Sequence, residues 1–170
     1  MRCRIMTYGP LLAGVPVYRF WSDAFKTHLY TIDANEKDTI IATYSEEQYK
    51  YEGVAFYVYS EKPLSSRVIH ELVPVHRFYS DNLKHHFFTA DEIEKSDFIQ
   101  NYPDTWTYEG VAWYADSSNE SDTTAVYRFY SPLLQSYHYT TDDVERDWII
   151  NTFSSEQWTS QGVAYYVNAH

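Results

Sequence analysis

The stretch "TYEGVAWY" at Thr107–Tyr114 decides the fold, because the chain contains two close variants of it. "KYEGVAFY" stands at Lys50–Tyr57 and "SQGVAYY" at Ser160–Tyr166. These copies hold three of the 5 glycines in the sequence. A glycine followed by small and aromatic residues is typical of a turn or bulge that leads into a strand. The phrase therefore predicts the last strand of a unit that occurs three times.

Two further motifs precede each copy in a fixed order. The first is "VYRFWS" from Val17, "VHRFYS" from Val75 and "VYRFYS" from Val126. The second is "HLYT", "HFFT" and "YHYT", which end at Thr31, Thr89 and Thr140. Aromatic and β-branched residues in such short runs predict two strands joined by a tight turn.

An Asp-x-x-Glu motif follows each strand pair. Its members are Asp33 and Glu36, Asp91 and Glu94, and Asp142 and Glu145. This spacing is a capping box, in which the aspartate accepts the first free amides of a helix and the glutamate reaches back to the N–H of the cap residue. We therefore expect a short helix to begin at each motif and to bury one face.

Each unit is thus expected to contain two strands, a helix and a third strand. The predicted fold is a β-rich α+β protein with three tandem β-β-α-β repeats, at residues 17–60, 75–116 and 126–168. Units of this size cannot bury a core alone, so we expect one domain over residues 1–170. The expected arrangement is β-trefoil-like or three-bladed, about a pseudo-threefold axis.

Composition narrows the classes of partner. A hydrophobic fraction of 44% and an aromatic fraction of 19% exclude a disordered chain. The apolar runs are shorter than the roughly 20 residues that span a membrane, so no membrane insertion is expected. With 13 Lys and Arg against 24 Asp and Glu, the surface should repel nucleic acid. No signal peptide is visible near the amino terminus, which leaves a cytoplasmic location and unconventional secretion open.

The motifs also resemble a known family. The order Arg-Phe-Tyr-Ser, His-x-aromatic-Thr, Asp-x-x-Glu and Glu-Gly-Val-Ala-aromatic-Tyr is similar to a tandem-repeat family classified as a domain of unknown function, over nearly all of Val17–Val167. That family is often appended to secreted bacterial and fungal hydrolases. The resemblance implies a non-catalytic, lectin-like binding module, by association and not by mechanism.

Candidate ligand-binding residues recur at matching positions. The polar candidates are His28 and Glu52, His86 and Glu109, and Tyr137 and Gln161. A carboxylate can accept two vicinal sugar hydroxyls, and imidazole can donate or accept. The alternative is structural: the glutamates pair with Arg19 and Arg77, and the histidines hold the turn. Tyr137 and Gln161 replace histidine and glutamate, so a third site would be altered or lost.

Aromatic candidates stand four residues before each glycine. They are Tyr49, Trp106 and Trp158. A displayed ring could stack on the apolar face of a pyranose, and packing in the core is the alternative. Phe20, Phe78 and Phe129 are expected in the core only.

No motif for catalysis is present. The sequence has no nucleophile elbow, no His-Glu-x-x-His, no phosphate loop and no twelve-residue calcium loop. His85 and His86 are neighbours on a predicted strand and should point to opposite faces, which disfavours joint metal binding. No cofactor is expected, although scattered carboxylates leave a metal, calcium in particular, open.

These observations predict a carbohydrate-binding protein, a lectin with two or three related sugar sites and no enzymatic activity. Its partners would be glycans or glycoconjugates, and repetition would raise avidity. The alternative is a protein-interaction or structural module without a sugar ligand, in which the 18 tyrosines contact a protein or a second copy in a homodimer.

Overall fold

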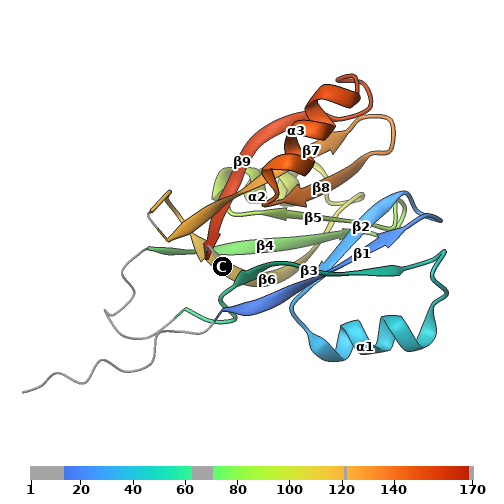
Figure 1. Cartoon of the computed structure of the whole chain (residues 1–170), viewed down its shortest axis with the longest axis horizontal. Helices are drawn as coiled ribbons and strands as arrows, with labels where there is room; N and C mark the ends of the chain where they lie inside the picture. Colours follow the sequence, from blue (N-terminus) through green and yellow to red (C-terminus); the bar gives the residue numbers. More distant parts are fainter. Residues whose placement is uncertain (1–13, 63–70, 121, 169–170) are drawn as a thin grey trace, which may run out of the picture.

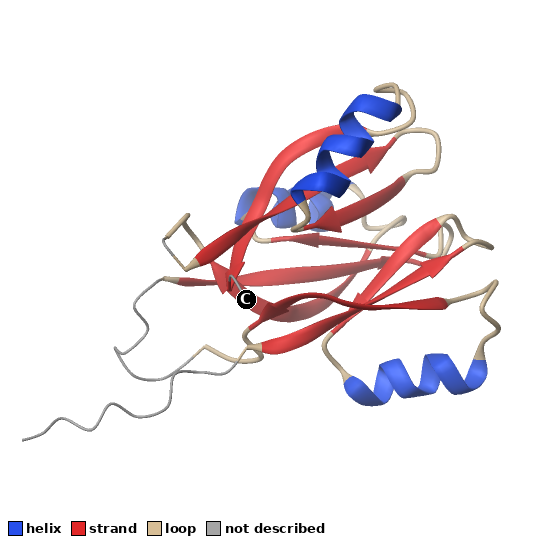
Figure 2. Cartoon of the chain, in the orientation of Figure 1, coloured by secondary structure: helices blue, strands red, loops and turns tan. Residues whose placement is uncertain are grey.

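The computed structural model describes residues 14–62, 71–120 and 122–168. The prediction that no signal peptide is present falls mainly on residues 1–13, which lie outside the described residues. Within these ranges the order strand, strand, helix, strand occurs three times (Figures 1 and 2). The first set is β1 (Val15–Ser22), β2 (Thr27–Thr31), α1 (Ala34–Thr43) and β3 (Lys50–Val58). The second is β4 (Leu72–Ser80), β5 (His85–Thr89), α2 (Glu92–Asn101) and β6 (Thr107–Asp116). The third is β7 (Thr123–Ser131), β8 (Ser136–Thr140), α3 (Asp143–Thr152) and β9 (Thr159–Asn168).

The glycine phrase lies in the third strand of each set, as predicted. Gly53, Gly110 and Gly162 have φ angles of +102°, +104° and +79°. The pairing of β1 with β3, of β4 with β6 and of β7 with β9 shifts register beside these glycines. A bulge with positive φ explains why glycine is required there.

The predicted arrangement about a pseudo-threefold axis, trefoil-like or three-bladed, is wrong. The described strands form two antiparallel sheets, one of three strands in the order β2-β1-β3 and one of six in the order β5-β4-β6-β9-β7-β8. The second and third sets share a sheet because β6 and β9 pair at Asp116 and Tyr166. The first set keeps its own sheet, and an isolated bridge between Tyr59 and Tyr114 links it to β6. The described residues form a mostly β fold with three helices, in place of the predicted β-rich α+β class.

One central core joins the two sheets. Its twelve buried side chains come from all three sets, and the largest of them are Trp113, Tyr30, Tyr139 and Tyr165. The predicted core residues Phe20, Phe78 and Phe129 are fully buried, which confirms that prediction.

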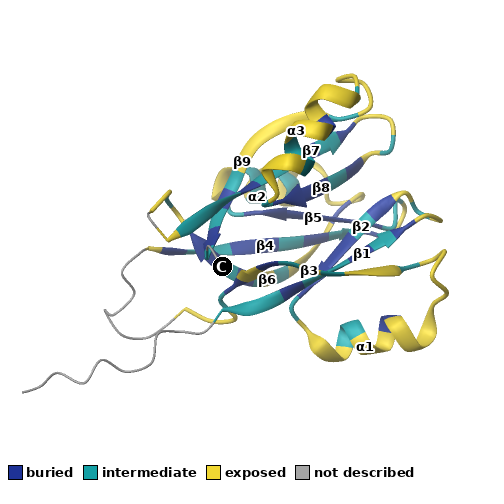
Figure 3. Ribbon diagram, viewed as in Figure 1, coloured by how far each residue is buried: buried dark blue, intermediate teal, exposed yellow. Residues whose placement is uncertain are grey.

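The helices lie on the outside of the strands and are largely exposed (Figure 3). Each helix packs one side against the strands, as expected: Ile40 of α1 and Ile149 of α3 are buried, and Phe98 of α2 is half-buried against Phe78 and Phe87.

Candidate functional site

An arginine in the first strand of each set reaches a glutamate of a helix in another set. The Arg77 guanidinium donates from Nη1 and Nη2 to the two Glu36 oxygens at 3.3 and 3.2 Å. Arg128 does the same to Glu94 at 2.8 and 2.9 Å, and Arg19 Nη1 lies 3.2 Å from Glu145 Oε2. Each pair connects a strand to a helix that is distant in the sequence.

The way each helix begins leaves its glutamate available for this contact. Asp33 Oδ1 accepts the amides of Asn35 and Glu36, so the aspartate caps α1 as predicted. The N–H of Asp33 donates to Thr31 Oγ1 at 3.0 Å. The glutamate was expected to accept that N–H, and this half of the capping-box prediction is wrong. At α2 and α3, Thr89 and Thr140 likewise accept the N–H of the cap aspartate in place of the helix glutamate.

Two of the three arginines have a second carboxylate. Arg19 Nε lies 2.8 Å from Glu52 Oε2, and Arg77 Nε lies 2.6 Å from Glu109 Oε2. The contact of Arg77 is an ion pair without the alignment of a hydrogen bond. Glu52 and Glu109 therefore do face arginines, as the structural alternative predicted, and the pairing lowers the pKa of Glu52 through its contacts with His28 and Arg19.

The third arginine lacks that partner. Gln161 stands where the other sets have glutamate, and Arg128 Nε is buried with no hydrogen-bond acceptor among the described residues. Tyr137 stands where the other sets have histidine, and its ring lies beneath the guanidinium, 6.0 Å from Arg128 Cζ. Phe87 lies 5.3 Å from the same atom. Aromatic faces thus support this cation where an imidazole supports Arg77.

The two candidate histidines lie behind the arginines. His86 Nε2 is 2.9 Å from Arg77 Nη2, and His28 Nε2 is 3.4 Å from Glu52. Burial, followed by the charge of Arg77, lowers the pKa of His86 to about 3. Burial also lowers the pKa of His28 to about 4. Both rings are therefore neutral at pH 7, and His86 accepts the guanidinium proton through Nε2.

The three candidate aromatic rings have different environments. Trp106 is only 9% exposed and packs against Phe87 and Phe98, so the structure places it in the core and not on display. It folds back onto the preceding hairpin before the third strand begins. Tyr49 is half-buried against the core cluster that contains Phe20, and Trp158 is half-buried beside the His138 ring.

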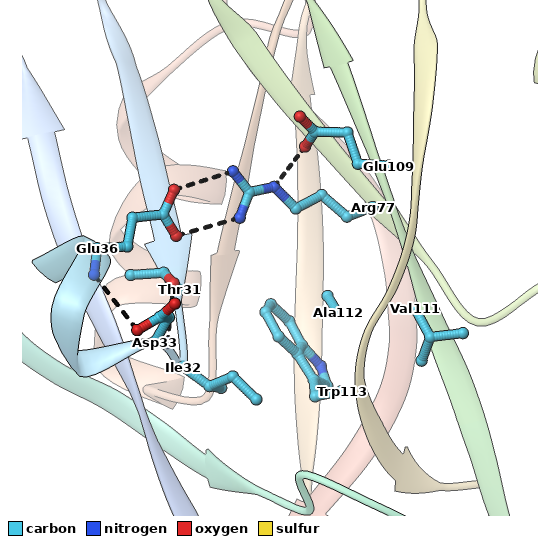
Figure 4. A pocket seen from close by; sticks show the side chains of 9 residues that line it. All are labelled: Thr31, Ile32, Asp33, Glu36, Arg77, Glu109, Val111, Ala112 and Trp113. Carbon is cyan, nitrogen blue, oxygen red and sulfur yellow. Dashed lines mark hydrogen bonds and ion pairs between the residues drawn. The ribbon is translucent and has the colours of Figure 1, made fainter.

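Two hollows lie where a helix start meets a strand of the next set. The first, about 350 Å³, lies between α1 and β6 (Figure 4). Its lining is Thr31, Ile32, Asp33, Glu36, Arg77, Glu109, Val111, Ala112 and Trp113. In Figure 4, Arg77 extends between Glu36 and Glu109, and Ile32, Val111 and Trp113 lie on the other side. The hollow thus has a charged wall and an apolar wall.

The second hollow, about 520 Å³, lies between α2 and β9. Its lining is Thr89, Asp91, Ile93, Glu94, Asp97, Arg128, Gln161, Val163 and Ala164. Threonine, aspartate, glutamate, arginine, valine and alanine thus line both hollows. Glu109 in the first and Gln161 in the second occupy matching positions, and Asp97 lines only the second.

Sequence reasoning found part of these hollows. Glu109 and Gln161 were predicted as ligand-binding residues, and each lines a hollow. Glu36 and Glu94 were assigned to capping alone, and Arg77 to structure. The signal that was missed is the recurring Thr-x-Asp spacing. The threonine hydroxyl accepts the N–H of the cap aspartate, so the glutamate does not need to accept it and can pair with an arginine instead.

Among the described residues, no group of three His, Cys, Asp or Glu side chains is arranged to hold a metal ion. In the same ranges, no helix has the length and apolar character needed to cross a membrane. Neither a comparison with curated proteins nor one with solved structures gave a match. A family model matches residues 16–168, which is most of the chain. The protein therefore belongs to the family described as "Domain of unknown function (DUF5648)".

Proposed function

We propose that the protein is a non-catalytic carbohydrate-binding protein and that its sugar sites are the two hollows. The observation that carries the proposal is that both combine an arginine–carboxylate pair with an aliphatic wall. Their volumes fall in the range of roughly 300–1,000 Å³ typical of small-molecule pockets. Sugars present vicinal hydroxyls at their edges and C–H groups on their faces, so such a hollow is complementary to them.

The polar wall of the first hollow offers fixed acceptors and donors. Glu109 Oε2 faces Arg77, and the Glu109 side chain is 35% exposed, so that Oε1 can accept a hydroxyl. Asp33 uses Oδ1 to cap α1, which leaves Oδ2 to accept a hydroxyl. Hydrogen bonds to charged groups are worth about 1.5–3 kcal/mol each, so a few suffice for weak and specific binding. Avidity would then depend on engaging both hollows at once.

The carboxylates around Arg19, which line neither hollow, are unsuited to acid catalysis. A glycosidase needs one carboxylic acid whose pKa is raised. The two glutamates that pair with Arg19 have lowered pKa values: contact with His28 lowers that of Glu52, and for Glu145 the contacts with His138 and Arg19 outweigh the effect of burial. Such carboxylates remain ionised and accept hydroxyl protons without donating one.

Glycan screening followed by calorimetric titration of the bound neutral sugars tests the proposal. Glu109→Gln should weaken binding at the first hollow by about 10-fold, the loss of one charged hydrogen bond. Glu46→Gln changes the same atoms on an exposed residue outside both hollows and should have no effect. Absence of binding to neutral and amino sugars, with and without calcium, would reject the proposal.

A second candidate, a protein-interaction module, is favoured by the exposed face of α3. Val144 and Trp148 are one helical turn apart and are 77% and 56% exposed. Trp106 can no longer belong to such a surface, because it is buried. Light scattering after size exclusion separates the two candidates. This second function would be favoured if the protein is a dimer, if Trp148→Glu dissociates the dimer, and if no sugar binds.

A further inference from the structure

The arginine–glutamate contacts link the three sets in a cycle. Arg77 joins the second set to α1 of the first, and Arg128 joins the third set to α2 of the second. Each of these two junctions carries one of the hollows. Arg19 of β1 joins the first set to Glu145 of α3, which closes the cycle. The start of α3 and strand β3 therefore meet at a third junction, whose arginine and glutamates line neither hollow.

The polar groups of the third junction resemble those of the first hollow. Arg19 lies between two carboxylates, Glu52 at 2.8 Å and Glu145 at 3.2 Å, as Arg77 does between its own two glutamates. The side chains of Arg19, Glu52 and Glu145 are 22%, 27% and 29% exposed, and those around Arg77 are between 20% and 35% exposed. The two glutamates are therefore open to solvent to a similar degree, and a ligand can contact them.

Aliphatic side chains are exposed at the third junction as they are in the hollows. Val54, one residue after the glycine bulge of β3, is 43% exposed, and the matching Val111 and Val163, which line the hollows, are 44% and 43% exposed. Val144 stands two residues after the cap aspartate of α3 and is 77% exposed. The matching residue of α2, Ile93, lines the second hollow. The third junction thus combines a charged side with an apolar side.

Trp148 distinguishes the third junction. It is the sixth residue of α3, and the sixth residue of α2 is Asp97, which lines the second hollow. Trp148 is 56% exposed and lies about one helical turn from both Val144 and Glu145. An indole therefore stands beside the arginine pair at a position that carries a carboxylate in the second hollow. The face of an indole is complementary to the C–H face of a pyranose.

The charge of the third junction determines which sugars suit it. The carboxylates of Glu52 and Glu145, together with that of the cap residue Asp142, outnumber the single guanidinium of Arg19. A site with this excess of negative charge disfavours an anionic sugar. Carboxylates accept hydroxyl protons, which every pyranose can supply.

We propose that the third junction is a further sugar site, in which a pyranose without negative charge stacks on Trp148 and donates hydroxyl protons to Glu52. This inference rests on the proposed carbohydrate-binding function and adds a site with an aromatic platform to the two hollows. Trp148 was not among the aromatic candidates found in the sequence, because it lies within a helix and not before a glycine bulge.

The test follows the indole N–H signals of the full chain by nuclear magnetic resonance during titration with glucose, galactose, mannose, glucosamine and glucuronate. The chain has 5 tryptophans, and the signal that Trp148→Tyr removes belongs to Trp148. This signal should shift and saturate with at least one of the four sugars that lack a carboxylate. Glu52→Gln should weaken that titration about 10-fold, the loss of one charged hydrogen bond, whereas Glu109→Gln in the first hollow should leave it unchanged.

Equilibrium dialysis with the radiolabelled sugar counts the molecules bound per chain. Trp148→Asp installs the residue type of the second hollow and should lower that number by one, whereas Trp148→Tyr keeps an aromatic face and should preserve it. Trp148 is exposed, so neither variant is expected to unfold the protein.

The outcomes separate this inference from the proposed function. If sugars bind but the Trp148 signal does not move, or moves equally in Glu52→Gln, the inference is overturned and the proposed function stands. Tighter binding of glucuronate than of glucose at this signal also overturns it. So does a dimer that Trp148→Asp dissociates, because a second copy of the chain would then cover the indole. Absence of all sugar binding rejects the proposed function and this inference together.

Discussion

His28 and His86 illustrate how burial sets the charge of a single side chain. Each imidazole lies next to an arginine and near a glutamate, a setting in which a solvated histidine would gain a proton. Desolvation outweighs the contact with Glu52 at His28, and at His86 the charge of Arg77 adds to desolvation, so the pKa values fall to about 4 and about 3. The neutral ring of His86 is what allows it to accept from Arg77. His86 therefore positions Arg77 and His28 contacts Glu52, and neither is a direct sugar ligand in our proposal.

This neutrality predicts a loss of stability in mild acid. The unfolded chain protonates these histidines near pH 6.5, whereas the folded chain does so only near pH 4 and pH 3. Because the unfolded state binds more protons in this window, the free energy of unfolding falls as the pH falls, by up to about 1.4 kcal/mol per pH unit for each histidine. Urea denaturation between pH 7 and pH 4.5 measures the slope.

The His28→Gln and His86→Gln variants provide the comparison for that slope. Each removes one titrating group and keeps a polar side chain, so each should flatten the pH dependence, and the double variant should flatten it most. A wild-type slope that persists in the double variant would show that other groups cause the acid sensitivity.

At the scale of elements, the sequence predicted where the helices begin but not what their glutamates contact. Asp33, Asp91 and Asp142 cap as predicted, because capping is decided by residues two or three positions away. The partner of Glu94 is Arg128, 34 positions later in the chain, and no local pattern specifies it. The glycine bulges were predictable for the same local reason as the caps.

The caps lead to a prediction about α2. This helix has no fully buried residue, so its first turn depends strongly on Asp91, whose carboxylate accepts the amides of Ile93 and Glu94. Asp91→Ala should lower the free energy of unfolding by about 1 kcal/mol, whereas Asp91→Asn, which can also cap, should cost much less. Chemical denaturation measures both. Equal losses in the two variants would mean that the charge of Asp91 matters more than its capping.

For the whole molecule, the pairing between sets could not be predicted. The three sets have nearly the same local sequence, yet β6 and β9 pair at Asp116 and Tyr166 within one sheet, whereas the first set keeps its own sheet and is linked to β6 by an isolated bridge at Tyr59. Strand edges of similar composition compete for partners, and the choice depends on how the core side chains of all sets fit together. The symmetrical arrangement failed as a prediction because similar units need not make equal contacts.

The shared core predicts that the described sets unfold together. The buried Tyr139 hydroxyl accepts the amide of Phe88 and donates to its carbonyl, at 2.9 and 2.8 Å, which ties β8 to β5 across the core. Tyr139→Phe leaves both backbone groups without a partner and should lower the free energy of unfolding by about 1–3 kcal/mol. Far- and near-ultraviolet circular dichroism should still report one coincident transition, as expected for a single domain. Tyr44→Phe, an exposed control, should change little. Two separate transitions in the wild-type protein would show instead that the three-stranded sheet folds independently of the six-stranded sheet.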